Sequence, residues 1–482
     1  MSYIILKSRV IAEIKECLIL AVPLAGAQLS QGATTFVDTV MMGILGSQII
    51  AAGALGASIF HILMYMGSGI VSSVSPLAAE AYGAGRVEQV SRVVRQGLLL
   101  SLILAVPTTL IIWHGGTLLR LFGQEPKTVA LAEEYLRAIA WGYLPGLGFA
   151  VLKSFVSALS KPRPVIAIVI GGTLLNIVGN YILMFGKYGF PALGLAGIGY
   201  ASAFSFWAMF AALAIYILNH PQLRIYVAFS ALHQFERKVF WELMQVGVPI
   251  GVLAGVEGGF FTCVTFLMGQ LGTVTLAAHQ IAFQTAILTF MIPVGLSIAT
   301  TVRVGQLVGQ ENPKGARLAG FVGIGMAAVF MAAMGILFWA FPERIVSLYI
   351  DTTDPKNVAV VSLAKQLLGV AAMFQIADGI QVAAAGALRG LKDTRIPLLI
   401  GALAYWGIGL TCGYTLGLLL GLGGVGLWWG FVMGDPERWK LSEFLVLLSP
   451  FLAPDGYASS IALQACCYYI CTGNPNTSRT HG

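Results

Sequence analysis

Three acidic side chains lie inside long apolar segments of the chain, where ionised groups are costly. They are Asp38, Glu257 and Asp378, and no Lys or Arg lies at a comparable position to pair with them. An ionised side chain at the centre of a bilayer costs about 2.5–3.5 kcal/mol on insertion scales, so such groups usually face a cavity and a partner. The sequence therefore predicts that these carboxylates bind a proton, a metal cation or a cationic molecule. The alternative is a permanently protonated carboxyl that hydrogen-bonds between helices.

Polar residues at helical spacing accompany the acids. Gln375, Asp378 and Gln381 are three residues apart and are predicted to share one helix face. Carboxylate and amide oxygens suit a hard cation such as Na+. We therefore expect a coupling cation to bind at Glu257, Asp378, Gln381 and Gln375, with the two acids as the Na+ ligands.

A second set of polar residues lies in the first half of the chain, with the acid Asp38. Gln31 precedes Asp38 by two helical turns, and Asn176 and Asn180 lie four residues apart in another apolar segment. We expect this group to bind a proton, a cation or a substrate. The alternative for the asparagines is a role in holding helices together.

Two further features lie near these acids. Gly251, Gly255 and Gly259 form a stripe of small residues opposite Glu257, which predicts the close approach of another helix. His279 could carry protons, but a hydrogen-bonded histidine at the start of its span is the favoured interpretation.

The composition places the whole chain in a membrane. Of 482 residues, 57% are hydrophobic and only 10% are charged, with a mean hydropathy of +0.83. About a quarter of the residues of a soluble domain are charged, so a water-soluble enzyme is excluded. The six cysteines have no metal-type spacing and are interpreted as reduced thiols.

Eleven apolar segments are long enough to cross a bilayer, and a twelfth begins but is truncated. All should be helices, because a helix satisfies its own backbone hydrogen bonds in lipid. The predicted spans lie near 18–44, 51–79, 96–118, 138–158, 164–186, 194–218, 243–268, 275–301, 318–341, 359–388 and 397–421, and a twelfth begins at Gly424.

Basic residues divide unevenly between the two sides. The N-terminus and the even-numbered loops carry far more Lys and Arg than the odd-numbered loops, which places the N-terminus in the cytoplasm. This asymmetry explains the net charge of +7 without nucleic-acid binding. Lys153, near the end of its span, is expected to extend its charge to the interface.

The chain contains a tandem duplication. A shift of 226 residues aligns Gly46 with Gly272 and Gly83 with Gly309, among other pairs. Six spans separate equivalent points, so the halves should be related by a pseudo-two-fold axis along the membrane normal, with a central cleft. The alternative is that the duplication only builds a helix bundle. The predicted units are an N-terminal lobe (1–219), a cytoplasmic linker (220–241), a C-terminal lobe (242–434) with a truncated last span, and an atypical tail (435–482).

Several motifs resemble the multidrug and toxic compound extrusion (MATE) family, in its NorM-like bacterial branch. The matching stretches are FVDTVMMG at 36–43, LAAHQIA at 276–282, RVGQLVGQENPKGAR at 303–317 and AAAGALRGLKDTRIP at 383–397. The resemblance covers about residues 15–434. It implies an all-α fold of two six-helix lobes that exports organic-cation drugs and dyes in exchange for Na+ or H+ by alternating access. We expect no cofactor, and a monomer spanning the lipid bilayer of the bacterial inner membrane.

The resemblance also assigns residues. Glu257 and Asp378 match the carboxylates that bind the coupling cation in the C-terminal lobe of NorM-like members. Asp38 matches a first-helix aspartate used in protonation or cation binding, and Asn176 and Asn180 match amides near it. Because both acids of the C-terminal lobe are present, Na+ coupling is favoured over H+.

Other functions are less consistent with the residues. A lipid-linked precursor flippase of the same superfamily would line its cleft with basic residues, and a H+-coupled carrier of other small metabolites is a further alternative. The two-lobe duplication favours a carrier over a channel. An enzyme would need a nucleophile–base pair or a metal cluster, and no HExxH or GxSxG motif occurs.

The resemblance ends at Gly434. The sequence DPERWK follows, and its four charged residues cannot continue a span that began at Gly424. Two shorter apolar runs follow, near 444–453 and 457–471. We therefore expect an altered or frame-shifted C-terminus, with an authentic variant of the family as the alternative.

Overall fold

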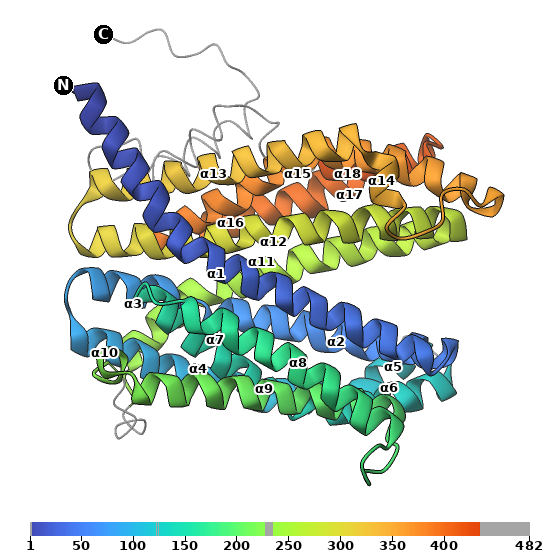
Figure 1. Ribbon diagram of the computed structural model, residues 1–482, viewed down its shortest axis with the longest axis horizontal. Helices are drawn as coiled ribbons and strands as arrows, with labels where there is room; N and C mark the ends of the chain where they lie inside the picture. The colour runs from blue at the N-terminus through green and yellow to red at the C-terminus, as the bar shows by residue number, and fades with distance from the viewer. Residues whose placement is uncertain (1, 122, 124, 227–234, 434–482) are drawn as a thin grey trace.

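Helices make up nearly all of the chain that this computed structural model describes, namely residues 2–121, 123, 125–226 and 235–433, and no strand occurs among these residues. Nine of the described helices are long and apolar enough to cross a membrane, and a bent helix pair makes a tenth. The helices form two lobes, with α2–α9 in one and α11–α18 in the other (Figure 1). The predicted all-α membrane fold of two lobes is confirmed.

The first half of the chain contains nine described helices in order. They are α1 (Ser2–Ile44), α2 (Ser47–Val71), α3 (Val74–Gly83), α4 (Val87–Trp113), α5 (Gly115–Leu121), α6 (Pro126–Ala140), α7 (Tyr143–Ala158), α8 (Arg163–Phe185) and α9 (Gly194–Asn219). The predicted fourth span is a pair, α6 and α7, bent by 46°.

A short helix leads from this lobe to the second. The remaining helices are α10 (Pro221–Arg224), α11 (Arg237–Gln270), α12 (Thr273–Gly309), α13 (Pro313–Ala340), α14 (Pro342–Val346), η2 (Pro355–Asn357), α15 (Val358–Gly390), α16 (Arg395–Ala402), η3 (Leu403–Gly409), α17 (Leu410–Tyr414), η4 (Thr415–Leu419) and α18 (Gly423–Met433). The twelfth predicted span begins as α18, and the predicted tail lies outside the described residues.

The eleventh span is not a regular α-helix. Its middle contains two π-helical turns, η3 and η4, on either side of α17. Turns of this kind are rare and occur frequently at functional sites. The hydrophobic pattern of the sequence did not predict them.

Equivalent glycines support the duplication. Gly46, before α2, has φ 115° and ψ 165°, and Gly272, before α12, has φ 112° and ψ 168°. A residue with a Cβ rarely adopts this backbone conformation. The same turn therefore joins the first two spans of each lobe.

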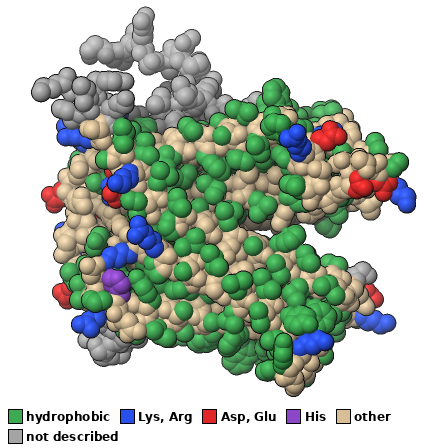
Figure 2. All heavy atoms as spheres, in the orientation of Figure 1, with side chains coloured by type: hydrophobic (Ala, Val, Ile, Leu, Met, Phe, Trp, Pro, Cys, Tyr) green, Lys and Arg blue, Asp and Glu red, His purple; other side chains and the backbone are tan. Residues whose placement is uncertain are grey.

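The lobes touch at one end and separate at the other. Figure 2 shows them packed together on the left and divided by a cleft on the right. We call the left end, where α3 and α12 finish and α1 begins, the closed end, and the right end the open end. In this view the described part of the chain is thus open at the right end.

Two glycines allow the closed end to form. A Cβ on Gly83 would lie 2.0 Å from the carbonyl oxygen of Gln306, and a Cβ on Gly309 would lie 2.0 Å from that of Glu80. The duplication aligns these glycines, so α3 and α12 cross with their backbones in direct contact. No side chain larger than hydrogen fits either position without movement of the backbone.

Polar contacts join the lobes beside this crossing. Lys392 Nζ lies 2.5 Å from Glu80 and 2.8 Å from Glu242. The 226-residue shift aligns Gln306 with Glu80. The Gln306 side chain extends from the C-terminal lobe to the N-terminal lobe, where it donates a 2.7 Å hydrogen bond to the Ala158 carbonyl. Burial lowers the pKa of Lys392, but its hydrogen bonds to Glu242 and Glu80 outweigh burial and raise the pKa overall, so Lys392 stays charged at neutral pH.

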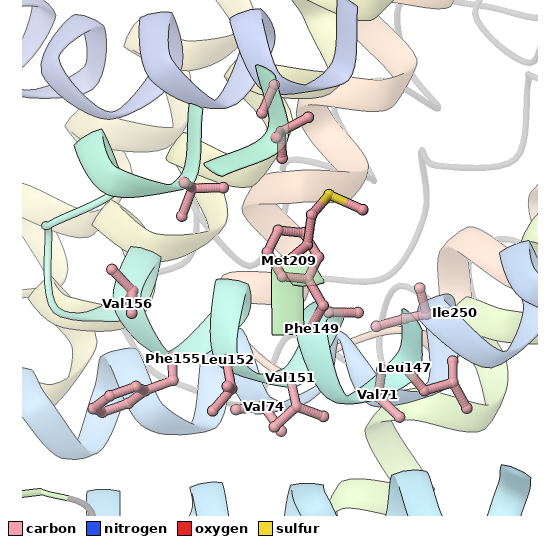
Figure 3. Close-up of a cluster of buried hydrophobic side chains, with 14 of the residues drawn as sticks. Val71, Val74, Leu147, Phe149, Val151, Leu152, Phe155, Val156, Met209 and Ile250 are labelled. Atoms are coloured by element: carbon pink, nitrogen blue, oxygen red, sulfur yellow. The ribbon is translucent and has the colours of Figure 1, made fainter. Parts of the chain in front are cut away.

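The hydrophobic core continues from one lobe into the other at the closed end. Val71 of α2, Leu147 of α7 and Ile250 of α11 belong to one buried cluster (Figure 3). The same cluster includes Val302 of α12 and Leu388 of α15, whereas the open-end half of the C-terminal lobe has a core of its own. Apolar burial therefore stabilises the closed end together with the ion pairs.

Adding one methyl group at the crossing should open the closed end. We expect Gly309→Ala to increase the separation of spin labels placed on α3 and α12, because the Glu80 carbonyl is backbone and cannot move independently. The matched control is Gly369→Ala in α15, where a new Cβ meets no atom within 4 Å. Overpacking of this kind costs about 1–3 kcal/mol. Equal label distances in the two variants would contradict the proposed crossing.

Candidate functional site

Asp378 lines a small cavity in the C-terminal lobe. The cavity has a volume of about 10 Å³, comparable to the space for one water molecule. Its walls come from α11, α15, η3 and α18, and its lining residues are Phe261, Phe374, Asp378, Gln381, Tyr405 and Phe431. One carboxylate is therefore surrounded by one amide, one phenol and three phenylalanines.

The π-helical turn η3 brings a tyrosine to this cavity. The Gln381 amide donates a hydrogen bond of 3.1 Å to the Tyr405 hydroxyl. Trp406, the next residue, donates to the Val256 carbonyl at 2.9 Å and fixes η3 against α11. Carboxylate, amide and phenol oxygens suit a hard cation, and aromatic faces attract organic cations.

Glu257 lies one helical turn from the cavity wall. It precedes Phe261 by four residues in α11, so the two share a helix face. The partly buried Glu257 carboxylate interacts electrostatically with the guanidinium of Arg389 at the end of α15. No ion pair within 4 Å joins these two described residues, so Glu257 is not locked to a guanidinium.

Gln375 points away from the Asp378 cavity. Its Oε1 accepts a 3.5 Å hydrogen bond from Thr289 of α12, and its Nε2 is buried without a partner among the described residues. The structure therefore brings together Asp378 and Gln381 but not Gln375. The physical reason is that six residues span one and two-thirds turns, so Gln375 and Gln381 lie about 120° apart on α15.

The glycine stripe of α11 meets two different helices. A Cβ on Gly251 or Gly255 would contact Met66 of α2, in the other lobe, at 2.5 and 3.1 Å. The predicted close approach of a helix is confirmed there. A Cβ on Gly259 would instead lie 3.2 Å from Trp406.

The acid of the N-terminal lobe belongs to a hydrogen-bonded network. Asp38 Oδ1 accepts a 2.6 Å bond from Asn180 Nδ2, and its Oδ2 accepts a 3.5 Å bond from the Ser202 hydroxyl. Asn180 also donates to Asn176 Oδ1 at 3.1 Å, and Asn176 donates to Ser202 at 2.9 Å. Three predicted residues thus meet. Gln31, two turns away on α1, has no bond in the part of this network that the structure describes.

His279 is a structural histidine in a fixed tautomer. The Trp428 indole, which can only donate, donates to His279 Nδ1 at 3.0 Å. Nδ1 therefore carries no proton, and Nε2 carries it and donates to Thr265 at 3.0 Å. The ring also stacks on Phe283. These bonds support the hydrogen-bonded interpretation of His279 over proton transport.

One basic side chain points inward. Lys153 Nζ lies 3.5 Å from Gln28 Oε1 on α1, inside the N-terminal lobe. The expectation that Lys153 extends to the interface was wrong, because its Cβ tilts toward the helix N-terminus and so away from the nearby end of α7.

Several site residues were not identified from the sequence. Tyr405, Phe261 and Ser202 are ordinary residues of apolar spans, and only contacts between helices assign them. Arg389 belongs to a recognised motif but was counted as a loop residue. No three His, Cys, Asp or Glu side chains cluster to hold a metal ion in the described ranges.

Comparisons with known proteins agree with this architecture. The chain is 47% identical over 423 residues to "Probable multidrug resistance protein NorM" of Synechocystis sp., covering 88% of this chain and 92% of that protein. It is 41% identical over 418 residues to "Multidrug resistance protein NorM" of Burkholderia vietnamiensis, covering 86% and 89%.

Solved structures show the same fold at low identity. The crystal structure of the eukaryotic MATE transporter AtDTX14 matches with a TM-score of 0.81 and 20% identity, covering 95% of this chain and 99% of that one. An outward-facing multidrug resistance MATE family transporter of the MOP superfamily matches with a TM-score of 0.81 and 18% identity, covering 94% and 96%. The MatE family model matches residues 23–182 and 249–415, one stretch in each lobe. The chain therefore belongs to the MATE family of membrane transporters.

Proposed function

We propose that this multidrug efflux transporter is an antiporter that exports organic cations in exchange for Na+ or H+. The observation that carries the proposal is the Asp378 carboxylate in a small aromatic cavity of one lobe. The names of the NorM relatives support multidrug substrates. A carboxylate in a membrane must be neutralised, and either the coupling ion or a cationic drug can supply the positive charge. Both cations therefore need the same carboxylate.

The closed end faces the cytoplasm in this proposal. It carries the start of α1 and the loops rich in Lys and Arg, and the positive-inside rule assigns such loops to the cytoplasm. The cleft shown in Figure 2 then opens to the outside. In this state the protein releases its substrate and takes up the coupling ion.

The exchange follows from competition for negative charge. An external cation that binds Asp378 and Glu257 displaces a cationic drug, or favours the shape that releases it. An ion shifts such an equilibrium only by its differential affinity for the two states. Inward movement of one positive charge releases about 2.3 kcal/mol per 100 mV of membrane potential, and this drives the return to the inward-open state.

The two lobes have different roles. The C-terminal lobe offers two acids and neutral oxygens without a close ion pair at Glu257, which supports Na+ as its coupling ion. In the N-terminal lobe, Asp38 already accepts hydrogen bonds from Asn180 and Ser202. We assign Asp38 to proton binding or substrate contact.

Removing the charge of the two acids in the C-terminal lobe should uncouple drug export from the ion gradient. We expect Asp378→Asn and Glu257→Gln to lower Na+-driven efflux of a fluorescent cation from vesicles about tenfold or more, within the 5–150-fold range of coupling free energies. The control is Glu134→Gln, an exposed acid on α6. Normal pumping by both variants under both Na+ and H+ gradients would contradict the assignment.

Asp38→Asn tests whether the two lobes bind different coupling ions. We expect proton-driven efflux to fall about tenfold while Na+-driven efflux stays within about twofold of the wild type, because asparagine has the shape of aspartate but no titratable charge. Efflux is measured in the same vesicles under each gradient separately. An equal loss under both gradients would assign both ions to one shared site.

A further inference from the structure

A wide apolar groove lies on the boundary between the lobes. Its volume is about 1140 Å³, above the roughly 300–1,000 Å³ of ordinary small-molecule pockets. Helices α1 and α8 of one lobe and α12 and α13 of the other form its walls, including Leu18, Ile166, Ile292 and Phe321. All of its lining residues are apolar or glycine. Their side chains therefore offer no hydrogen bond or charge to a polar ligand along the groove.

One end of this groove carries positive charge. The Arg317 guanidinium lies 5.7 Å from the centre of the Phe321 ring, which lines the groove. Arg163 begins α8 and precedes the lining residue Ile166 by three positions, so both lie on one face. Both arginines are exposed, and neither forms an ion pair within the described ranges. On this face, Lys and Arg side chains gather at the closed end beside a hydrophobic surface (Figure 2).

Two acids lie on this part of α1, Glu13 and Glu16, and both interact with Arg303. Glu13 lies between Val10 and Ile14, which both line the groove, but its two oxygens bind Arg303 at 2.7 and 2.8 Å. The end of the groove therefore attracts an anion.

We propose that this groove binds one anionic phospholipid, with its acyl chains against α1 and α13 and its phosphate at Arg317 and Arg163. An apolar channel that ends at exposed basic residues at the level of the closed end matches the two parts of such a lipid. An exported cation fits less well, since two guanidinium groups at the mouth repel it. Because the walls belong to both lobes, the bound lipid stabilises the closed end.

Native mass spectrometry of the purified protein tests the headgroup contact. We expect the wild type to retain phosphatidylglycerol over phosphatidylcholine, and Arg163→Gln/Arg317→Gln to weaken phosphatidylglycerol retention about 30-fold, from about 1 kcal/mol per basic residue. The control is Arg344→Gln, since Arg344 also lies over a ring, that of Phe341 at 5.3 Å, but follows the other end of α13 and does not line the groove. Unchanged retention in the double variant, or displacement of the lipid by millimolar inorganic phosphate, would overturn the proposal.

A second variant tests the acyl-chain site with the charges intact. Gly325 lines the groove, and a Cβ there meets no atom within 4 Å, so Gly325→Phe should fill the groove without a clash. We expect it to reduce phosphatidylglycerol retention, while Gly171→Phe on the exposed face of α8, with equal free space, does not. The lipid assignment fails if retention is the same in both variants. It also fails if Gly325→Phe slows dye export in phosphatidylcholine vesicles, since the groove would then be a substrate path.

Discussion

A carboxylate in the hydrocarbon of a membrane must be neutralised, and the C-terminal lobe is arranged around that requirement. Asp378 faces a cavity of about 10 Å³ walled by aromatic rings and two neutral polar groups. Glu257 lies one turn along α11 and interacts with Arg389 without a close ion pair. The lobe therefore offers two carboxylates that, in our proposal, an incoming cation neutralises.

A transporter also needs a contact between its lobes that closes one side of the membrane and can open again. The closed end provides this contact. Backbone contact at Gly83 and Gly309, the Lys392 ion pairs and a shared hydrophobic core hold the lobes together on one side. Ser160 and Lys392, which follow α7 and α15, both adopt left-handed backbone conformations and both contact the opposite lobe. Such strain costs about 1–3 kcal/mol per residue and is typical of switching regions. The contact between the lobes at the closed end thus consists of a few discrete interactions.

Much of this architecture could be predicted from the sequence, because lipid imposes simple rules. Apolar runs become helices, and repeated glycines such as Gly46 and Gly272 mark the duplication. Asp38, Asn176 and Asn180 meet as the family resemblance implied, and the spacing of four residues predicted only that the two asparagines share a face. The failures share one cause, which is that a periodicity along one helix does not say which neighbour each face meets. Gln375 therefore turns to Thr289, Lys153 turns inward to Gln28, and the π-helical turn that presents Tyr405 has no pattern in the sequence.

The central claim is that drug and coupling ion bind the same carboxylates in the C-terminal lobe. Equilibrium binding of radioactive Na+ to the purified protein, titrated with tetraphenylphosphonium and repeated across pH, measures this coupling directly. We predict that each cation lowers the affinity for the other by the same factor, because linkage between binding sites is reciprocal, and that Asp378→Asn abolishes the effect. Independent binding of Na+ and the organic cation at all concentrations would contradict the account.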